Sequence, residues 1–208
     1  ALCGHFRAGG GTFRRAEVQH VAPRSAGVDV TSGGETLHVD HAVLATGAWS
    51  GRLARRLGHR PALESERGYH LVLKRPSRTP PGAYMLSDSA FVATPMAGGL
   101  RLAGLVEFGG LSAGPSSGPT GLQRRRVRDL YPDLEWEAEE VWMGHRPTTR
   151  DSLPLIGESP KAPGIWFAFG AQHLGLTTGP KTGRLIADMI SGRRPNIDLS
   201  PFRVGRFD

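Results

Sequence analysis

Two short runs of apolar residues constrain the fold of this chain more than any other feature. Residues 42–47, AVLATG, and residues 165–170, IWFAFG, are apolar until they close on small residues and a glycine, and each precedes a segment with helical spacing. Such runs are typical of strands buried on both faces of a sheet. In open α/β sheets, a ligand binds beyond the carboxyl ends of these strands. The sequence therefore predicts two strand–turn–helix units with a ligand site at their strand ends.

The residues between these two units have a different character. Alternating apolar and polar runs before residue 44 predict half-buried strands, with a hairpin turn at residues 32–35, SGGE. From Pro61 to about His145, strand-like runs separated by Pro and Gly predict an antiparallel sheet. Residues 121–130 predict a helix within this region.

These patterns lead to an expected domain organisation. We expect an α/β (α+β) fold in which residues 1–58 and 146–208 form one domain. Residues 59–145 are expected to form an inserted antiparallel-sheet domain. Ser50 is expected to cap the helix after the first apolar run, and Gly192 is expected to end the closing helix.

The turn after the second apolar run has the features of a site for an anion or a flavin. Gly170, Gly175 and Gly179 alternate with polar residues immediately before the closing helix. The free N–H groups and the positive dipole end of a helix favour a negative charge, and a reduced flavin carries one. Gly47, after the first run, has two interpretations: close approach of the backbone to a ligand, or a tight strand-to-helix turn.

Three further side chains are candidates for substrate binding. Arg146 follows a strand-like run and precedes a proline, and a guanidinium can bind a carboxylate through two parallel hydrogen bonds. The alternative is an ordinary surface arginine. In ERGYHLVL, residues 66–73, alternation places Tyr69 with Arg67 on one face of a strand and His70 on the other. A tyrosine or a histidine in such a position is more often a packing residue than a functional one, and this is the alternative for both Tyr69 and His70.

Charge and cysteine content exclude other classes of function. The net charge is +7, but the basic residues, all but three of them arginine, are scattered along the chain. The one tight basic cluster, at residues 124–128, is typical of a solvated helix face, so we expect no nucleic-acid partner. A lone cysteine, Cys3, excludes an internal disulfide and a cysteine-rich metal site, and we predict no metal. A cytoplasmic location is expected, with peripheral attachment to the inner membrane as the alternative.

Four motifs, in their order and spacing, resemble FAD-dependent D-amino-acid dehydrogenases, which belong with D-amino-acid oxidases, glycine oxidases and sarcosine oxidases. The resemblance covers nearly the whole chain and corresponds to the carboxyl-terminal part of that family. Because the chain also opens at Ala1 in what reads as the middle of a helix, we expect a fragment of a bacterial flavoprotein. The motifs are HAVLATGAWSGRLARRLG, ERGYHLVL, GHRPTTRDSLPLIGESP and FGAQHLGLTTGPKTGRLIADMISGRRPNIDLSPFRVGRF.

The resemblance implies roles for individual residues. Arg146 would bind the substrate carboxylate, and Tyr69 and His70 would line the substrate cavity. The backbone of Val18 would meet the adenine of FAD, and Thr46 and Gly47 would pass its adenosine and phosphate part. The residues expected near the isoalloxazine ring are Gly157, Gly170, His173, Leu174, Gly175 and Thr177.

Two departures from the family pattern stand out. Family members usually have a Gly-His pair where this chain has Gly170 and Ala171, and His173 is the nearest replacement. The GxGxxG fingerprint of a βαβ unit is also missing, since the glycines at residues 9–11 follow a helix-like stretch. The expected fold is therefore a partial, Rossmann-like FAD-binding domain that lacks its N-terminal βαβ unit.

The resemblance also implies an activity. It is the oxidation of a D-amino acid, or of a cyclic D-imino acid, to an imine and then a 2-oxo acid, by hydride transfer to flavin N5. A quinone or the respiratory chain is the expected electron acceptor. Two alternatives stay open: an oxidase of glycine or sarcosine type that uses oxygen, and a non-catalytic fragment that does not hold FAD alone.

Overall fold

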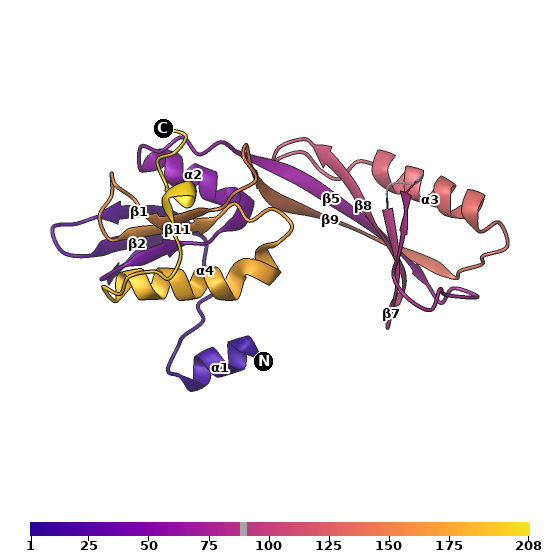
Figure 1. Cartoon of the computed structure of the whole chain (residues 1–208), viewed down its shortest axis with the longest axis horizontal. Coiled ribbons are helices and arrows are strands. Elements are labelled where there is room, and N and C mark those ends of the chain that lie inside the picture. Colours follow the sequence, from indigo (N-terminus) through magenta and orange to yellow (C-terminus); the bar gives the residue numbers. More distant parts are fainter. Residues whose placement is uncertain (88–90) are drawn as a thin grey trace.

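The computed structural model describes residues 1–87 and 91–208, and these residues form two lobes joined by long strands (Figure 1). Helix α1 (Leu2–Ala8) precedes the two-sheet lobe, which contains β1 (Val18–Pro23), β2 (Val28–Ser32), β3 (Glu35–Val39), β4 (Ala42–Leu44), η1 (Gly47–Trp49), α2 (Ser50–Arg56), β10 (Leu155–Glu158), β11 (Ile165–Phe169), α4 (Gly175–Ile190) and η3 (Ser200–Phe202). The five-stranded lobe contains β5 (Leu63–Lys74), β6 (Tyr84–Leu86), β7 (Phe91–Met96), β8 (Gly99–Phe108), α3 (Gly118–Leu130) and β9 (Ala138–Thr149).

The two apolar runs lie side by side as strands β4 and β11, although more than a hundred residues separate them. They pair in parallel, with Phe167 opposite Leu44, and β10 adds an antiparallel strand on the far side of β11. Their carboxyl ends therefore meet at one edge, as the sequence predicts. Strand β11 is buried on both faces, but Val43 of β4 is exposed, so the expectation of full burial is wrong for β4.

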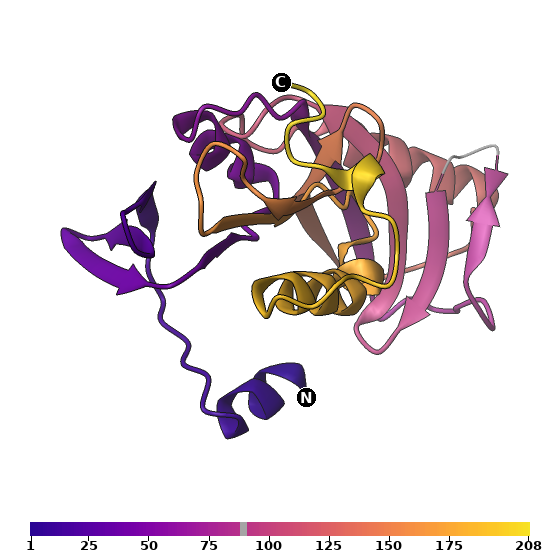
Figure 2. The same ribbon diagram turned by 60° about the vertical axis from the view of Figure 1, so that its left-hand side comes forward.

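Two apolar layers hold this sheet between its neighbours. One face packs on β1, β2 and α2 through a core that includes Leu44, Leu53 and Phe167. The other face packs on α4, where Ile186 contacts Ile156 and Trp166. Figure 2 shows α4 running beneath this sheet. The expected apolar face of the closing helix therefore anchors α4 to the sheet.

The predictions for the start of α2 and the end of α4 are confirmed only in part. Gly192 directly follows the C-cap of α4 with φ of 72°, as expected for a glycine at a helix end. Ser50 is not the cap of α2: it lies in the first helical turn, after Trp49 and the 3₁₀ turn η1. Its hydroxyl lies 2.9 Å from that of Thr46, and this contact ties the helix back to the end of β4.

The inserted region forms the antiparallel sheet that the sequence predicts. Its strand order is β6-β7-β8-β5-β9, and every neighbouring pair is antiparallel. Helix α3 covers one face, where Val127 packs against a core that includes Leu71, Leu102 and Phe91. In Figure 2 this helix lies behind the sheet. The expected domain boundary at residues 145–146 falls inside β9, which pairs with β5 as far as Thr149, and the division into two domains stays a prediction.

Helix α1 stands apart from both lobes. It is joined to β1 by an extended segment (Figures 1 and 2), and none of its residues is buried. The Phe6 ring of this helix contacts the Phe13 ring of the segment that follows, so the contact is local. The prediction that the opening residues are helical is therefore confirmed, but the helix adds nothing to the core.

Candidate functional site

A cleft of about 580 Å³ lies where the carboxyl ends of β4 and β11 meet α4, and it runs along the length of that helix. Its walls are uncharged and mostly small or apolar. Figure 1 shows that α4 begins at its end nearest the five-stranded lobe. The lining residues are Val43, Ala45, Gly47, Pro147, Pro154, Ala168, Phe169, Gly170, Ala171, Gly175, Thr178, Gly179, Thr182, Gly183, Ile186, Ala187 and Ile190.

Two glycines in the cleft are required for different reasons. Gly47 has φ of 57°, and a Cβ placed on it would meet no atom within 4 Å. Its backbone turn needs glycine, while the space beside it is open to a ligand. Gly170 has φ of 87°, and a Cβ there would lie 2.8 Å from Cγ2 of Thr149. Gly170 is therefore fixed by close packing between β11 and β9.

The start of α4 favours a negative group. Its N-cap residue, Leu174, forms no side-chain hydrogen bond, and the first turn contains no acidic residue. The first backbone N–H groups of a helix have no partner within the helix and carry its positive dipole end. An anionic or electron-rich edge of a ligand in the cleft would meet these groups.

The cleft includes a stripe of small residues on α4 that the sequence interpretation recognised only in part, since it placed Gly175 and Gly179 before the helix and did not single out Gly183. Gly175, Gly179 and Gly183 recur at every fourth residue, and Thr178 and Thr182 flank them. Residues four apart share one face of a helix, so the small residues keep the helix backbone close to the cleft. The GxxxGxxxG spacing is the signal that could have found them.

The structure divides the residues predicted for flavin binding. Gly47, Gly170 and Gly175 line the cleft, and so does Ala171, which stands where the family has histidine. The side chains of His173, Leu174 and Thr177 are exposed, and these residues are not part of the cleft lining. Gly157 lies in β10 opposite Phe167, also away from the lining.

A second, smaller cavity brings together two of the three residues predicted near the adenosine and phosphate part of the cofactor, while Gly47 lines the larger cleft. Val18 and Thr46 line this space of about 250 Å³ with Val30 and Val39. Val43 of β4 borders both cavities. The two spaces therefore flank the same short strand, which suits a long ligand that crosses the strand end.

Arg146 directly precedes Pro147, a residue of the cleft wall, and its side chain packs on strand β5. Its guanidinium donates to Oε1 of Glu66 at 3.1 Å, and the Thr148 hydroxyl donates to Oε2 of the same carboxylate at 3.0 Å. The next residue, Pro147, lines the cleft, and its carbonyl accepts a hydrogen bond from the Gln172 N–H at 3.1 Å. Strand β9 and the turn before α4 therefore fix the backbone that joins Arg146 to the cleft wall.

His70 and Arg146 share one face of the five-stranded sheet. In the β5–β9 register, His70 opposes Trp142, and Glu66 opposes Arg146 four residues away on each strand. The His70 ring stacks on the Trp142 indole, with centroids 4.9 Å apart. Burial, with a further contribution from Arg101, lowers the pKa of His70.

Tyr69 lies on the opposite face, away from Arg146. It is 1% exposed and donates to Oε2 of Glu107 at 2.7 Å, while its oxygen accepts from the Ser116 N–H at 3.1 Å. Arg67 donates to the same carboxylate oxygen at 2.6 Å. The geometry matches the packing interpretation of Tyr69, which joins β5 and β8 to the loop at residues 109–117.

Comparison with known proteins identifies the family. Residues 1–189 match the family described as "DAO: FAD dependent oxidoreductase". The chain belongs to the DAO family. It is 37% identical to a D-amino-acid oxidase of Bradyrhizobium diazoefficiens over all of this chain and 50% of that protein. It is 33% identical to a D-amino acid dehydrogenase of Paramagnetospirillum magneticum over 88% of this chain and 44% of that protein.

A solved structure supports the same placement. The glycine oxidase of Geobacillus kaustophilus superposes with a TM-score of 0.77 at 26% identity, over 94% of this chain and 53% of that one. The chain thus spans about half the length of the DAO-family relatives that it matches. The α/β fold with an antiparallel substrate-domain sheet is confirmed, as is the partial coverage.

The cleft fits the cofactor of the DAO family, whose members depend on FAD. Open space at Gly47, uncharged walls and the uncapped start of α4 suit a flat, electron-accepting ring with a polar edge. Within residues 1–87 and 91–208, no cluster of three His, Cys, Asp or Glu side chains is arranged to hold a metal ion. Every helix in the described residues is too short or too polar to cross a bilayer.

Proposed function

We propose that this chain is part of an FAD-dependent enzyme that oxidises the amine of a D-amino acid, or of a cyclic D-imino acid. The product is an imine, which water hydrolyses to a 2-oxo acid and ammonia, whereas a cyclic substrate gives a cyclic imine. The observation that carries this proposal is Arg146, an oriented guanidinium that directly precedes a residue lining a flavin-sized cleft.

Arg146 supplies the anchor for the substrate. Its Nη1 is engaged by Glu66, so the side chain is already oriented before a substrate arrives. The other edge of the guanidinium can bind a carboxylate by donating charge-assisted hydrogen bonds to it. Holding the carboxylate fixes the position of the Cα–H bond relative to the cleft, and such orientation is a major part of catalysis.

The residues around the cleft would hold the cofactor. Gly47 leaves room for the ring, Gly170 lets the end of β11 pack closely beside it, and the N–H groups at Gly175 would meet its polar edge. When bound, FAD accepts the hydride that leaves the substrate Cα. The apolar walls exclude water from this point, which strengthens the electrostatic contacts within the cleft. Val18 and Thr46 would lie along the adenosine part.

Replacing the anchor tests the proposal. In the complete gene product, Arg146→Ala should reduce kcat/KM for D-amino acids at least about thirtyfold, since loss of one partner of a buried charge pair costs about 2–5 kcal/mol. Arg146→Lys is the matched control: it keeps the charge and should retain part of the activity, because only the forked geometry is lost. Near-normal kinetics in Arg146→Ala would contradict the proposal.

Direct reaction with oxygen is the second candidate. The similarity to a D-amino-acid oxidase at 37% identity favours it over a quinone or respiratory-chain acceptor. Peroxide release can be measured during turnover with and without an artificial electron acceptor. Stoichiometric peroxide without the acceptor indicates an oxidase, and turnover that requires the acceptor indicates a dehydrogenase.

The third candidate is a chain that holds no FAD by itself. The exposed Val43 edge of β4 and the open walls of the cleft favour it. The 208-residue chain can be purified and mixed with FAD, and its visible spectrum recorded after gel filtration. A retained flavin absorbance would reject this candidate, whereas a colourless protein would support it.

A further inference from the structure

The open face of the five-stranded sheet carries two glycines directly opposite one another. Gly68 of β5 pairs with Gly144 of β9, between the Glu66–Arg146 row and the His70–Trp142 row. Neighbouring residues in antiparallel strands are about 4.5–5.5 Å apart at Cα. The glycine pair therefore forms a stretch of bare backbone, the floor of this face, between Arg146 and the aromatic pair of His70 and Trp142.

Two large side chains fold over this floor. A Cβ on Gly68 would lie 2.3 Å from Cζ of Arg146, so the guanidinium lies flat against this backbone. A Cβ on Gly144 would lie 2.0 Å from Cη2 of Trp142, so the indole does the same one strand away. Any residue larger than glycine would displace the group above it. The guanidinium and the indole are thus held side by side.

We propose that Arg146 and Trp142 together hold one amino-acid ligand, with its carboxylate on the guanidinium and a bulky apolar side chain on the indole. This inference rests on the function proposed above and assigns the substrate class: amino acids with large apolar or aromatic side chains, rather than glycine or sarcosine. Gly68 and Gly144 are positioning residues for the two contacts.

The surroundings of the indole are suited to an apolar group. Trp142 is 52% exposed, although its other face stacks on His70 at an interplanar angle of 14°. Because burial lowers the pKa of His70, this ring is neutral near pH 7 and places no charge beneath the indole. Val106 and Phe108 of β8, opposite Gly68 and Glu66, are also exposed on this face. Covering exposed apolar side chains of this kind with an apolar group of a ligand is favourable, because it removes apolar surface from water.

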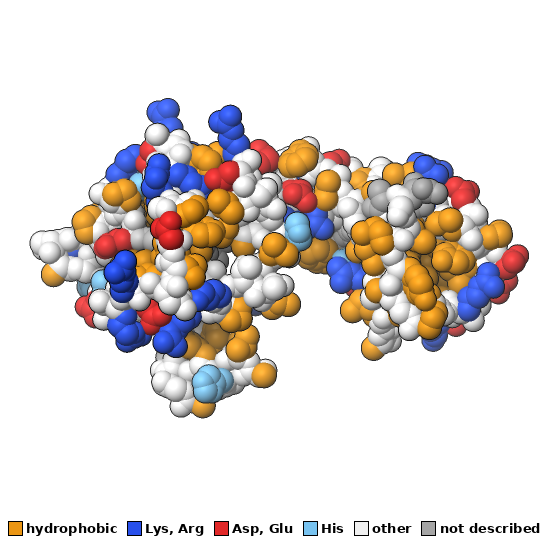
Figure 3. Space-filling model, viewed as in Figure 1, with side chains coloured by type: hydrophobic (Ala, Val, Ile, Leu, Met, Phe, Trp, Pro, Cys, Tyr) orange, Lys and Arg blue, Asp and Glu red, His pale blue; other side chains and the backbone are white. Residues whose placement is uncertain are grey.

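The spacing of the two contacts fits a single amino acid. Paired positions about 5 Å apart match the short distance between the carboxylate and the side chain on one Cα. A glycine-sized ligand would reach Arg146 but would leave the indole uncovered. The space-filling view shows the outline of the molecule indented between the two lobes, below the long strands that carry these residues (Figure 3).

Two carboxylate probes separate the two contacts. Benzoate carries an apolar ring and acetate does not, and the affinity of each for the complete gene product can be measured by calorimetry. We expect benzoate to bind at least about tenfold more tightly, since burial of an aromatic ring is worth more than one factor of ten. Trp142→Ala should remove most of this preference and change acetate binding less than about threefold.

Three further variants make the result specific. Gly144→Ala should displace the indole and remove the benzoate preference while Trp142 is still present. Trp142→Phe should retain part of the preference. Tyr84→Ala, at an aromatic residue on β6 with a similar exposed fraction of 48%, should leave both affinities unchanged. Circular dichroism confirms that each variant is folded.

The outcomes separate this inference from the proposed function. If Arg146→Ala abolishes binding of both probes but Trp142→Ala and Gly144→Ala keep the benzoate preference, the substrate-class inference is wrong and the carboxylate anchor stands. If neither probe depends on Arg146, the proposed function fails as well. The same ratio should appear in turnover, with kcat/KM for D-phenylalanine falling relative to D-alanine in Trp142→Ala.

Discussion

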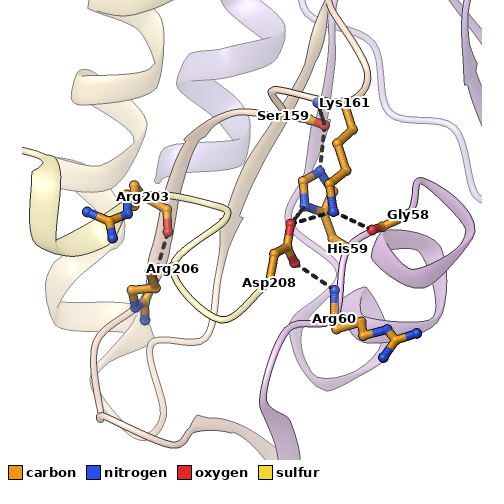
Figure 4. Close-up of polar contacts among 8 residues, drawn as sticks. All are labelled: Gly58, His59, Arg60, Ser159, Lys161, Arg203, Arg206 and Asp208. Atoms are coloured by element: carbon orange, nitrogen blue, oxygen red, sulfur yellow. Dashed lines mark hydrogen bonds and ion pairs between the residues drawn. The ribbon is translucent and has the colours of Figure 1, made fainter.

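Nδ1 of His59 lies 2.8 Å from Oδ2 of Asp208, and this contact joins the loop after α2 to the final segment of the chain (Figure 4). His59 is 1% exposed, and its Nε2 lies 2.8 Å from Oγ of Ser159. Asp208 also accepts a hydrogen bond from the Arg60 N–H and pairs with Lys161. One imidazole therefore links three segments of the two-sheet lobe.

We expect His59→Ala to destabilise the protein by about 1–3 kcal/mol, because it leaves buried polar partners without hydrogen bonds. The free energy of unfolding can be measured by urea titration. His20→Ala replaces an exposed histidine on β1 and should change it by less than about 0.5 kcal/mol. Equal effects of the two substitutions would show that the His59 contacts add no stability.

Acid should weaken the same link through Asp208. Burial alone raises the pKa of this carboxyl, but hydrogen bonds from the Arg60 N–H, Lys161 and His59 outweigh it and lower the pKa to about 2 from an ordinary value of 3.8. A lowered pKa in the folded state means that the stabilisation is complete above pH 3.8 and is lost as the pH falls toward 2. Asp208→Asn should lower the stability at pH 6 and flatten its dependence on pH between these values. An unchanged pH profile in this variant would assign the acid sensitivity to other carboxyls.

Gly170→Ala should destabilise the protein by about 1–3 kcal/mol, because φ is positive and the new methyl group would press on Thr149. Gly183→Ala is the matched control in the same cleft. A Cβ there meets no atom within 4 Å, and alanine favours a helix, so stability should stay equal or rise by up to about 1 kcal/mol. Thermal unfolding of both variants distinguishes strain at Gly170 from a general effect of filling the cleft.

Tyr69→Phe tests which face of the sheet binds the substrate. The Tyr69 hydroxyl is the largest cause of the lowered pKa of Glu107, followed by Ser116. Its loss should raise that pKa and cost about 0.5–1.5 kcal/mol of stability. Because Tyr69 lies on the opposite face from Arg146, KM for a D-amino acid should stay within about twofold of the wild type. A large rise in KM without loss of stability would instead place Tyr69 in the substrate cavity.

Local features of the fold followed from the sequence, and long-range contacts did not. Three kinds of feature could be predicted, because each depends on the period of one short segment. They are the apolar runs at β4 and β11, the hairpin at Gly33 and Gly34, and the apolar face of α4. The cap at Ser50 was wrong, since a 3₁₀ turn precedes the helix. The cluster at His59 was missed, because its partners lie 100 and 149 residues away.

The sequence by itself determined the elements, the family and the candidate anchor. Alternation within β5 separates Tyr69 from His70, and a strand followed by proline marks Arg146. Only the tertiary structure decided which of these residues lie together on one face of the sheet. The register between β5 and β9 places Arg146 beside Glu66 and over Gly68, some 80 residues away, and turns Tyr69 to the other face. Register is a property of two paired strands and their packing, so neither strand alone encodes it.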